Sequence, residues 1–234
     1  MTPDEFYFAA AGDVHGEMHA LVKYRKLVDF PDYHSGRAKF PWPVYFIGGN
    51  HEPYGFLDAI PGGGECAPNC RYLGRAICTE IEGLRIAGLS GIYHPERSFA
   101  PRPPIADISR VSNKEYIYFT ETEVQALMEA ERADILLVHE WPAGVIASED
   151  EHRFERQRRS MRYDDVGNEY AQMLMETLKP GLTLAGHMHI SYANSIIFDH
   201  EKLPFRALAH VAFGLDAVAL FRVRDGKIEE IKGP

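Results

Sequence analysis

The stretch that decides the fold is AAAGDVHGEMHALVKYRKLVDF, residues 9–30. It continues an apolar run, FYFAAAG over residues 6–12, which predicts a buried strand that ends in a glycine turn. The turn carries Asp13 and His15, and a carboxylate and an imidazole placed this way can hold a metal ion. Apolar residues at helical spacing over residues 17–28 predict a helix directly after the turn.

The whole chain has the composition of an ordinary globular protein. Its 234 residues, 45% hydrophobic and 25% charged, suit one domain over residues 1–234. The net charge of −9 argues against broad electrostatic binding of nucleic acid. We expect no membrane partner, since no apolar run approaches the length of a membrane span and no basic leader opens the sequence. An odd number of cysteines without a secretory signal favours reduced thiols and a cytoplasmic location.

Strand and helix patterns alternate along the first part of the chain, and strands dominate the last part. We expect strands over 43–49 and 134–142, a hairpin over 76–89 that turns at Glu82 and Gly83, a helix over 120–132 capped by Thr120, and a helix over 168–178. The glycine-rich residues 61–70 read as a loop. The fold class is therefore α/β in the form of an α+β sandwich, with two packed mixed sheets flanked by helices.

Three further features each leave two readings open. Cys66 and Cys70 are either ordinary buried cysteines or part of a zinc site, and their spacing favours the former. The proline-rich residues 94–110 are too long for a plain connector, so they form a candidate functional loop. The arginine-rich residues 149–162 read as a solvated face in preference to a phosphate-binding patch.

Polar side chains follow four predicted strands, the fourth of which opens the strand-to-turn unit LTLAGHMH over residues 182–189. Ligands are best positioned where the strands of a rigid sheet end. The motifs are GDVHG, GGNHE, VHEWP and GHMH. They supply six candidate metal ligands: Asp13, His15, Asn50, His139, His187 and His189. A carboxylate, an amide oxygen and several imidazoles together suit divalent manganese, iron or zinc.

The order of these motifs resembles the calcineurin-like metallophosphoesterase superfamily. Within it, the strings FIGGNHE, APNCRYLGRA, GLRIAGLSGIY and HEWP most closely resemble the RNA lariat debranching enzyme family. The resemblance implies a metallo-dependent phosphatase-like fold and a metal-dependent phosphodiesterase that acts on a phosphoester substrate, a nucleotide or RNA. We expect a compact relative of bacterial type, whose substrate need not be a lariat.

The resemblance also implies a role for each motif residue. Asp13, His15 and His189 would hold one metal ion, and Asn50, His139 and His187 would hold the second. His51 would act at the leaving group or phosphate as general acid or electrostatic stabiliser, and Glu52 would orient it. Such a metal pair makes hydroxide available near neutral pH and clamps phosphate oxygens.

One part of the superfamily pattern is missing from the sequence. A second Gly-Asp, whose aspartate bridges the two metals, is expected between Asp13 and Asn50, and none occurs there. We place the loss of a strand-helix segment near 21–23 and interpret Asp29 and Asp32 as loop residues. The loss predicts weak or single metal occupancy and reduced hydrolysis. The alternative functions are a catalytically weak binding or scaffold protein and, less favoured by the acidic charge, a plain nucleic-acid-binding domain.

Overall fold

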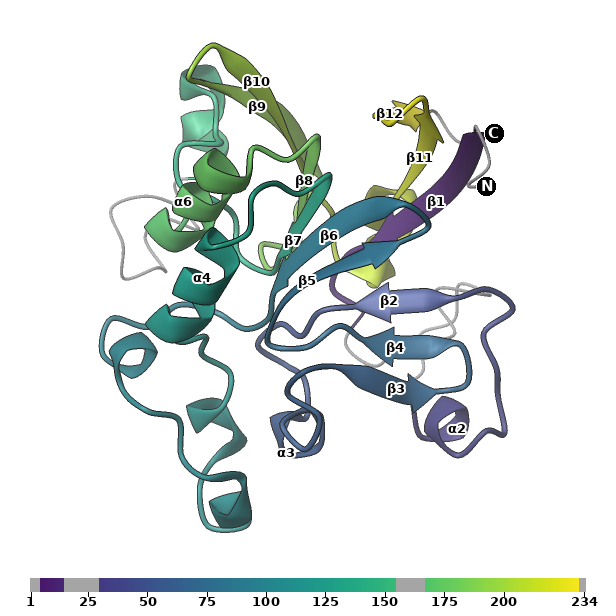
Figure 1. Cartoon of the computed structure of the whole chain (residues 1–234), viewed down its shortest axis with the longest axis vertical. Helices are drawn as coiled ribbons and strands as arrows, with labels where there is room; N and C mark the ends of the chain where they lie inside the picture. The colour runs from purple at the N-terminus through teal and green to yellow at the C-terminus, as the bar shows by residue number, and fades with distance from the viewer. Residues whose placement is uncertain (1–4, 15–29, 155–166, 232–234) are drawn as a thin grey trace.

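The computed structural model describes residues 5–14, 30–154 and 167–231 (Figure 1). The predicted helix over 17–28, His15 and the segment near 21–23 lie outside the described residues, as does most of the arginine-rich stretch. The predicted fold class, mixed sheets flanked by helices, is confirmed. The described strands form three sheets, so a small third sheet accompanies the two that were expected.

The central sheet has six strands in the order β5-β6-β7-β8-β10-β9. Their bounds are Ala76–Ile81, Leu84–Leu89, Ile135–Val138, Leu182–Ala185, Glu201–Ala207 and Tyr192–Phe198, in the same order. β6, β7, β8 and β10 run parallel, whereas the edge strands β5 and β9 are antiparallel to their neighbours. The carboxyl ends of the four parallel strands therefore lie at one edge of the sheet.

Helices α4 (Glu121–Met128) and α6 (Glu169–Leu178) cover one face of this sheet (Figure 1). The apolar sides of both helices meet the strands in one buried cluster, to which Leu127, Leu174, Leu136 and Phe205 contribute. Both helices begin at side-chain caps. Thr120, the predicted cap, accepts from the Glu123 amide, and Asn168, whose capping role was not predicted, accepts from the Ala171 amide. In return, the Glu123 side chain accepts a hydrogen bond from the Thr120 amide, which completes a capping box.

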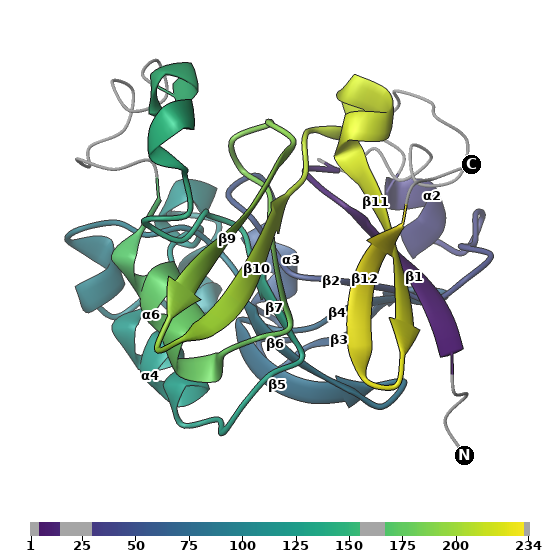
Figure 2. The ribbon, with the colours of Figure 1, turned by 90° about the horizontal axis from the view of Figure 1, so that it is seen from above.

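A three-stranded sheet packs against the opposite face (Figure 2). It consists of β1 (Glu5–Ala11), β11 (Val218–Arg224) and β12 (Lys227–Ile231), all antiparallel. The prediction of a buried first strand was only half right. Alternate β1 residues such as Phe6 and Phe8 join the core, and the residues between them are exposed, because an antiparallel sheet of this kind is covered on one side.

The third sheet, in the order β2-β4-β3, corrects the reading of residues 61–70 as a loop. It contains β2 (Val44–Phe46), β3 (Gly64–Ala67) and β4 (Cys70–Tyr72), with the short helices α2 (Phe30–His34) and α3 (Tyr54–Leu57) nearby (Figure 1). β3 was missed because it is short, glycine-led and irregularly paired. Cys66 and Cys70 are buried thiols in this region, and burial raises the pKa of Cys70 to about 12, which disfavours the thiolate that zinc binds.

In the described ranges, three of the two-residue turns between antiparallel strands have two consecutive left-handed residues. They are Glu82–Gly83, Asp199–His200 and Asp225–Gly226. The Glu82–Gly83 turn was predicted from the sequence. Paired left-handed residues match the right-handed twist of the strands, so these turns fix the hairpin registers.

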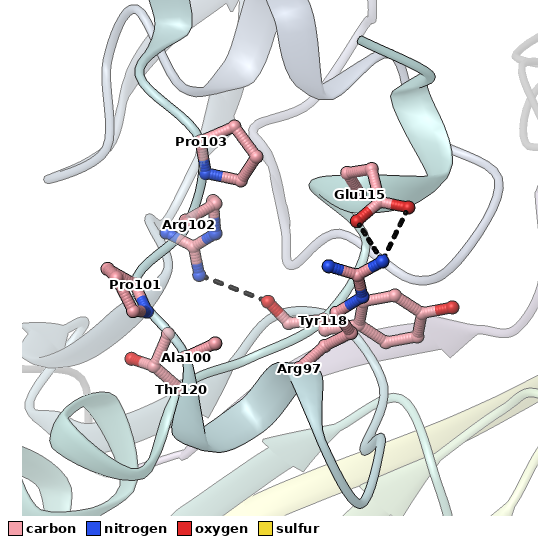
Figure 3. Close-up of a pocket in the computed structure, with 8 residues that line it drawn as sticks. All are labelled: Arg97, Ala100, Pro101, Arg102, Pro103, Glu115, Tyr118 and Thr120. Carbon is pink, nitrogen blue, oxygen red and sulfur yellow. Dashed lines mark hydrogen bonds and ion pairs between the residues drawn. The ribbon is translucent and has the colours of Figure 1, made fainter.

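The proline-rich stretch contains the short 3-10 helices η1 (Arg97–Phe99) and η2 (Ile105–Asp107), and η3 (Asn113–Glu115) follows it. It borders a cavity of about 50 Å³ that has room for a few waters rather than a nucleotide (Figure 3). Arg97 pairs with Glu115, and Arg102 bonds the Tyr118 carbonyl and the Glu123 carboxylate. Carboxylates therefore offset both cations beside the cavity, and the functional role of the loop stays a prediction.

Two further 3-10 helices complete the described structure: η4 (Ser148–Phe154) and η5 (Val211–Ala217). η4 carries the described part of the arginine-rich stretch, where an exposed Arg153 pairs with Asp150. That contact agrees with the solvated reading. Within the described ranges, none of the helices combines the length and apolar character needed to cross a bilayer.

Replacing Thr120 by alanine tests the capping box. We expect Thr120→Ala to lower the free energy of unfolding by about 1 kcal/mol, because the first turn of α4 loses its side-chain acceptor. Thr122→Ala, an exposed substitution in the same turn, is the control and should be neutral or slightly stabilising. Urea denaturation measures both, and equal effects of the two changes would contradict the role of the cap.

Candidate metal and phosphoester site

Four of the predicted ligands meet at the carboxyl ends of strands. His139 directly follows β7 and His187 lies two residues after β8, its parallel neighbour. Asp13 follows β1, and Asn50 lies in the loop after β2. A bond from the Gly186 amide to the His139 carbonyl (3.1 Å) extends the β7–β8 contact into the site. The parallel register therefore brings residues 48 positions apart in sequence into contact.

His139 is the centre of these contacts. Its Nε2 lies 2.9 Å from Asn50 Oδ1 and 3.2 Å from His187 Nδ1. Its Nδ1 lies 3.9 Å from Asp13 Oδ1. Gly49 permits this packing, since a Cβ atom there would stand 2.4 Å from the His139 ring. Any larger residue at position 49 would displace the imidazole.

Asp13 is fixed by the turn that follows β8. Its Oδ1 accepts the backbone N–H of His187 at 3.0 Å, and its side chain is fully buried. Burial raises the pKa of Asp13, while the His187 N–H and the nearby imidazoles of His189, His210 and His51 act in the opposite direction. The nearby N–H and imidazoles therefore offset only part of the cost of burying the Asp13 carboxylate.

Strained backbone accompanies three of the candidate ligands. Asp13, His187 and His189 have φ values of 39°, 68° and 56°, in the left-handed region that non-glycine residues rarely adopt. Such residues cost on the order of 1–3 kcal/mol each and cluster at functional sites. The turn GHMH therefore has a conformation that directs its side chains at a cost in stability.

The loop that carries His51 is held from three sides. Glu52 accepts the amides of Gly49 (2.6 Å) and His51 (3.2 Å). The buried Tyr54 hydroxyl donates to the Gly49 carbonyl, and Ser90 accepts the Gly48 amide. Glu52 therefore shapes the backbone beneath His51, and its predicted effect on the imidazole stays a prediction. Burial raises the pKa of Glu52, and the amide bonds lower it.

Sequence reasoning missed Glu140, although it stands next to His139. Its Oε2 accepts the Tyr93 amide at 2.7 Å and the Asn168 side chain at 2.9 Å, and its Oε1 lies 3.9 Å from His187 Nε2. It thus joins the start of α6, the chain after β6 and one candidate ligand. Burial raises the pKa of Glu140 to about 8 and lowers the pKa of His187 to about 4.

His210 was also missed. It lies three residues after β10, which is parallel to β8, so the rule that found His187 would have found it. Its ring centroid lies 5.1 Å from that of His189. Its Nδ1 accepts the Ala212 amide and starts η5. The apolar residues around His210 hid it in the sequence.

The sequence singled out four more residues in connection with this site: His51, His189, Asp32 and His15. His51 and His189 lie close enough to affect the pKa of both Asp13 and His187. The reading of Asp32 as a loop residue is wrong, because Asp32 lies in helix α2, where its carboxylate accepts from the Arg37 side chain. His15 lies outside the described residues. In the ranges that the structure covers, no three His, Cys, Asp or Glu side chains already surround one point as metal ligands would.

The donor set nevertheless fits a divalent cation in its chemistry. Asp13 supplies a buried carboxylate and Asn50 an amide oxygen. His139 and His187 supply imidazoles that meet edge-on, with ring centroids 4.9 Å apart. A lowered pKa keeps His187 neutral at pH 7, as a metal ligand must be. The direct contacts among these donors are ones that a cation between them would replace.

The mixed α+β fold, with an acid, an amide and imidazoles at its strand ends, agrees with the metallophosphoesterase resemblance of the sequence motifs. The chain is 34% identical over 185 residues to the lariat debranching enzyme of Schizosaccharomyces pombe, covering 77% of this chain and 40% of that protein. It is 34% identical over 182 residues to the enzyme of Arabidopsis thaliana (74% and 43%) and 33% identical over 176 residues to that of Entamoeba histolytica (73% and 49%).

These similarities confirm the resemblance to the lariat debranching enzymes, of which this chain is a relative. The chain spans about two fifths to a half of the length of these three relatives. No family model matches it.

The raised pKa of Glu140 predicts how stability depends on pH. In the folded protein Glu140 stays protonated up to about pH 8, whereas the unfolded carboxyl loses its proton near 4.5. Unfolding therefore releases a proton between these values, and the free energy of unfolding falls as pH rises. The lowered pKa of His187 acts in the opposite sense, but only below about pH 6.5.

We expect the metal-free protein to lose stability from pH 6.5 to 8, and Glu140→Gln to remove roughly 1–2 kcal/mol of that loss. Urea denaturation in EDTA at both pH values measures it. The exposed Glu80→Gln is the matched control. The same pH slope in wild type and Glu140→Gln would contradict the assignment.

Metal binding should stabilise the fold. We expect Mn²⁺ to raise the melting temperature, and more at pH 8 than at pH 6, because protons compete with the metal for Asp13 and the imidazoles. His139→Ala should abolish most of the shift, since His139 contacts three other donors. Exposed His152→Ala is the control. Thermal denaturation with and without Mn²⁺ is the measurement, and an undiminished shift in His139→Ala would exclude this site.

Proposed function

We propose that the chain is a metal-dependent phosphodiesterase that hydrolyses an RNA-like phosphodiester. The observation that carries the proposal is the meeting of Asp13, Asn50, His139 and His187 from four separate segments at one edge of the fold. Its relatives are named lariat debranching enzyme, which makes a branched RNA phosphodiester the first substrate to test.

The candidate site residues would each have a role in this reaction. Asp13, Asn50, His139, His187 and His189 would hold divalent cations, with His15 as the sixth ligand. Bound manganese, iron or zinc would lower the pKa of a water molecule and neutralise phosphate charge. His51 would donate a proton or a hydrogen bond to the leaving oxygen, and Glu52 would keep its loop in place.

His187 would be oriented from behind by Glu140. A carboxyl group near the second ring nitrogen of a metal-bound histidine fixes its tautomer by accepting that N–H, and it raises the basicity of the ring when it is ionised. Glu140 Oε1 lies 3.9 Å from His187 Nε2, on the side of the ring away from the His139 contact at Nδ1. This leaves His187 Nδ1 for the metal.

The proposal extends to the chain as a whole. Residues 1–234 would form one phosphoesterase domain that lacks the second Gly-Asp segment, and it would work in the cytoplasm with its thiols reduced. Substrate would be held by the site rather than by broad electrostatic attraction, given the net charge of −9. No contact within the described ranges favours the scaffold alternative over the enzyme.

Hydrolysis of bis-p-nitrophenyl phosphate tests the reaction class. We expect activity with Mn²⁺ that EDTA abolishes, and a fall in kcat of about 10²–10⁴-fold in His51→Ala, because the leaving oxygen loses its proton donor. His152→Ala, which removes an exposed histidine, should retain full activity. Unchanged turnover in His51→Ala would overturn the role of His51.

The substrate class needs a second comparison under the same conditions. Adenylyl dinucleotides that differ only in a 2′,5′ or 3′,5′ linkage separate a debranching-type activity from a general one. Preference for the 2′,5′ linkage supports a lariat-like substrate. Hydrolysis of bis-p-nitrophenyl phosphate with no cleavage of either dinucleotide would reject an RNA-like substrate.

A further inference from the structure

An exposed apolar pair stands on η5, beside the site. Phe213 and Leu215 expose 61% and 83% of their surface. Single exposed apolar residues are common and need no explanation. Here two of the most exposed large apolar residues occur within three positions, on a short segment next to candidate metal ligands. That placement calls for a function.

Both ends of η5 are attached to the site. At its start, the His210 ring is tilted toward that of His189, with centroids 5.1 Å apart, and its Nδ1 accepts the Ala212 amide. At its end, the Ala217 carbonyl accepts the Gly12 amide at 3.1 Å, one residue before Asp13. Figure 2 shows the segment as the yellow-green coil between β10 and β11. The apolar pair therefore lies on a segment, η5, whose two ends contact the surroundings of His189 and Asp13.

Hydrogen bonds and a glycine turn fix the backbone of η5, even though the side chains of Phe213 and Leu215 are exposed. Gly214 has φ 69° and ψ −125°, which divides η5 into two turns and which other residues rarely adopt. Bonds from the Ala209 amide to the Asp216 carbonyl and from the Val218 amide to the Leu215 carbonyl close the loop. Phe213 lies edge-on to His210, with ring centroids 6.4 Å apart.

A fixed, exposed aromatic ring beside a phosphoester site suits one ligand group in particular. Every nucleobase has a flat π face, and stacking on an aromatic side chain holds single-stranded nucleic acid without reading its sequence. The acidic chain has little long-range attraction for a polyanion, so affinity must come from such short-range contacts.

We propose that Phe213, flanked by Leu215, is the stacking platform for a nucleobase attached to the phosphate that the site takes. This inference rests on the proposed function and adds to it the side chain that binds the base of such a phosphoester. The platform contributes to binding and leaves the chemical step unaffected.

Calorimetric titration of the Mn²⁺-loaded protein with AMP and with ribose 5-phosphate tests the platform. The two probes share the phosphate and sugar, and AMP alone has a base. We expect wild type to bind AMP about 5- to 100-fold more tightly, and Phe213→Ala to remove this preference without changing the affinity for ribose 5-phosphate. AMP binding should depend little on salt beyond the dependence that ribose 5-phosphate shows.

Two further variants separate stacking from burial and from damage to the fold. Phe213→Trp should keep the AMP preference, whereas Phe213→Leu, still apolar but not aromatic, should lose most of it. Tyr7→Ala is the matched control, because Tyr7 is 60% exposed and lies on β1 six residues before Asp13. It should leave both affinities unchanged.

Three results would overturn the platform: no AMP preference in wild type, a preference that Phe213→Ala retains, or equal weakening of both probes in that variant. The first two would leave the exposed pair to another occupant, such as a protein partner or a second copy of the chain. Because calorimetry needs no turnover, failure of hydrolysis would reject the proposed function without deciding the platform.

The dinucleotide assay adds a kinetic readout. Phe213→Ala should raise KM for the dinucleotide by the same 5- to 100-fold and leave kcat unchanged. A loss of kcat with unchanged KM would contradict a role in binding the base.

Discussion

The parallel pairing of β7 with β8, and of β8 with β10, is the constraint on which the site depends. Because these strands run in one direction, His139, His187 and His210 emerge at the same edge of the central sheet. The sheet is covered by α4 and α6 on one face and by the β1 sheet on the other, so the strand ends cannot shift independently. The contact between His139 and His187 follows from this registration.

Burial at that edge gives the site its electrostatic character. Asp13, Glu52 and Glu140 all have a raised pKa, and His187 has a lowered one, because the low-dielectric surroundings disfavour charge. Backbone amides offset only part of that cost for the three carboxyl groups. A cation would offset much more, which explains how a fold can concentrate acids and imidazoles in one place. The same burial makes the metal-free protein sensitive to pH.

Local signals in the sequence predicted local structure well. The Thr120 capping box and the turn at Glu82–Gly83 both depend on residues within a few positions of one another. β3 was missed because a short, glycine-led strand has no local signal and forms only when β4 is beside it. The half-burial of β1 likewise depends on which sheet it joins, a fact that its apolar run does not contain.

The sequence by itself determined the motif order and which residue types end the strands, and from these the family resemblance and six candidate ligands. Only the tertiary structure decided that Asp13, Asn50, His139 and His187 are in contact, that Glu140 stands behind His187, and that His210 and Phe213 border the site. The physical reason is range. Side-chain chemistry and turn preference are properties of neighbours in sequence, whereas burial, pKa and contacts between residues far apart arise when strand pairing brings distant segments together.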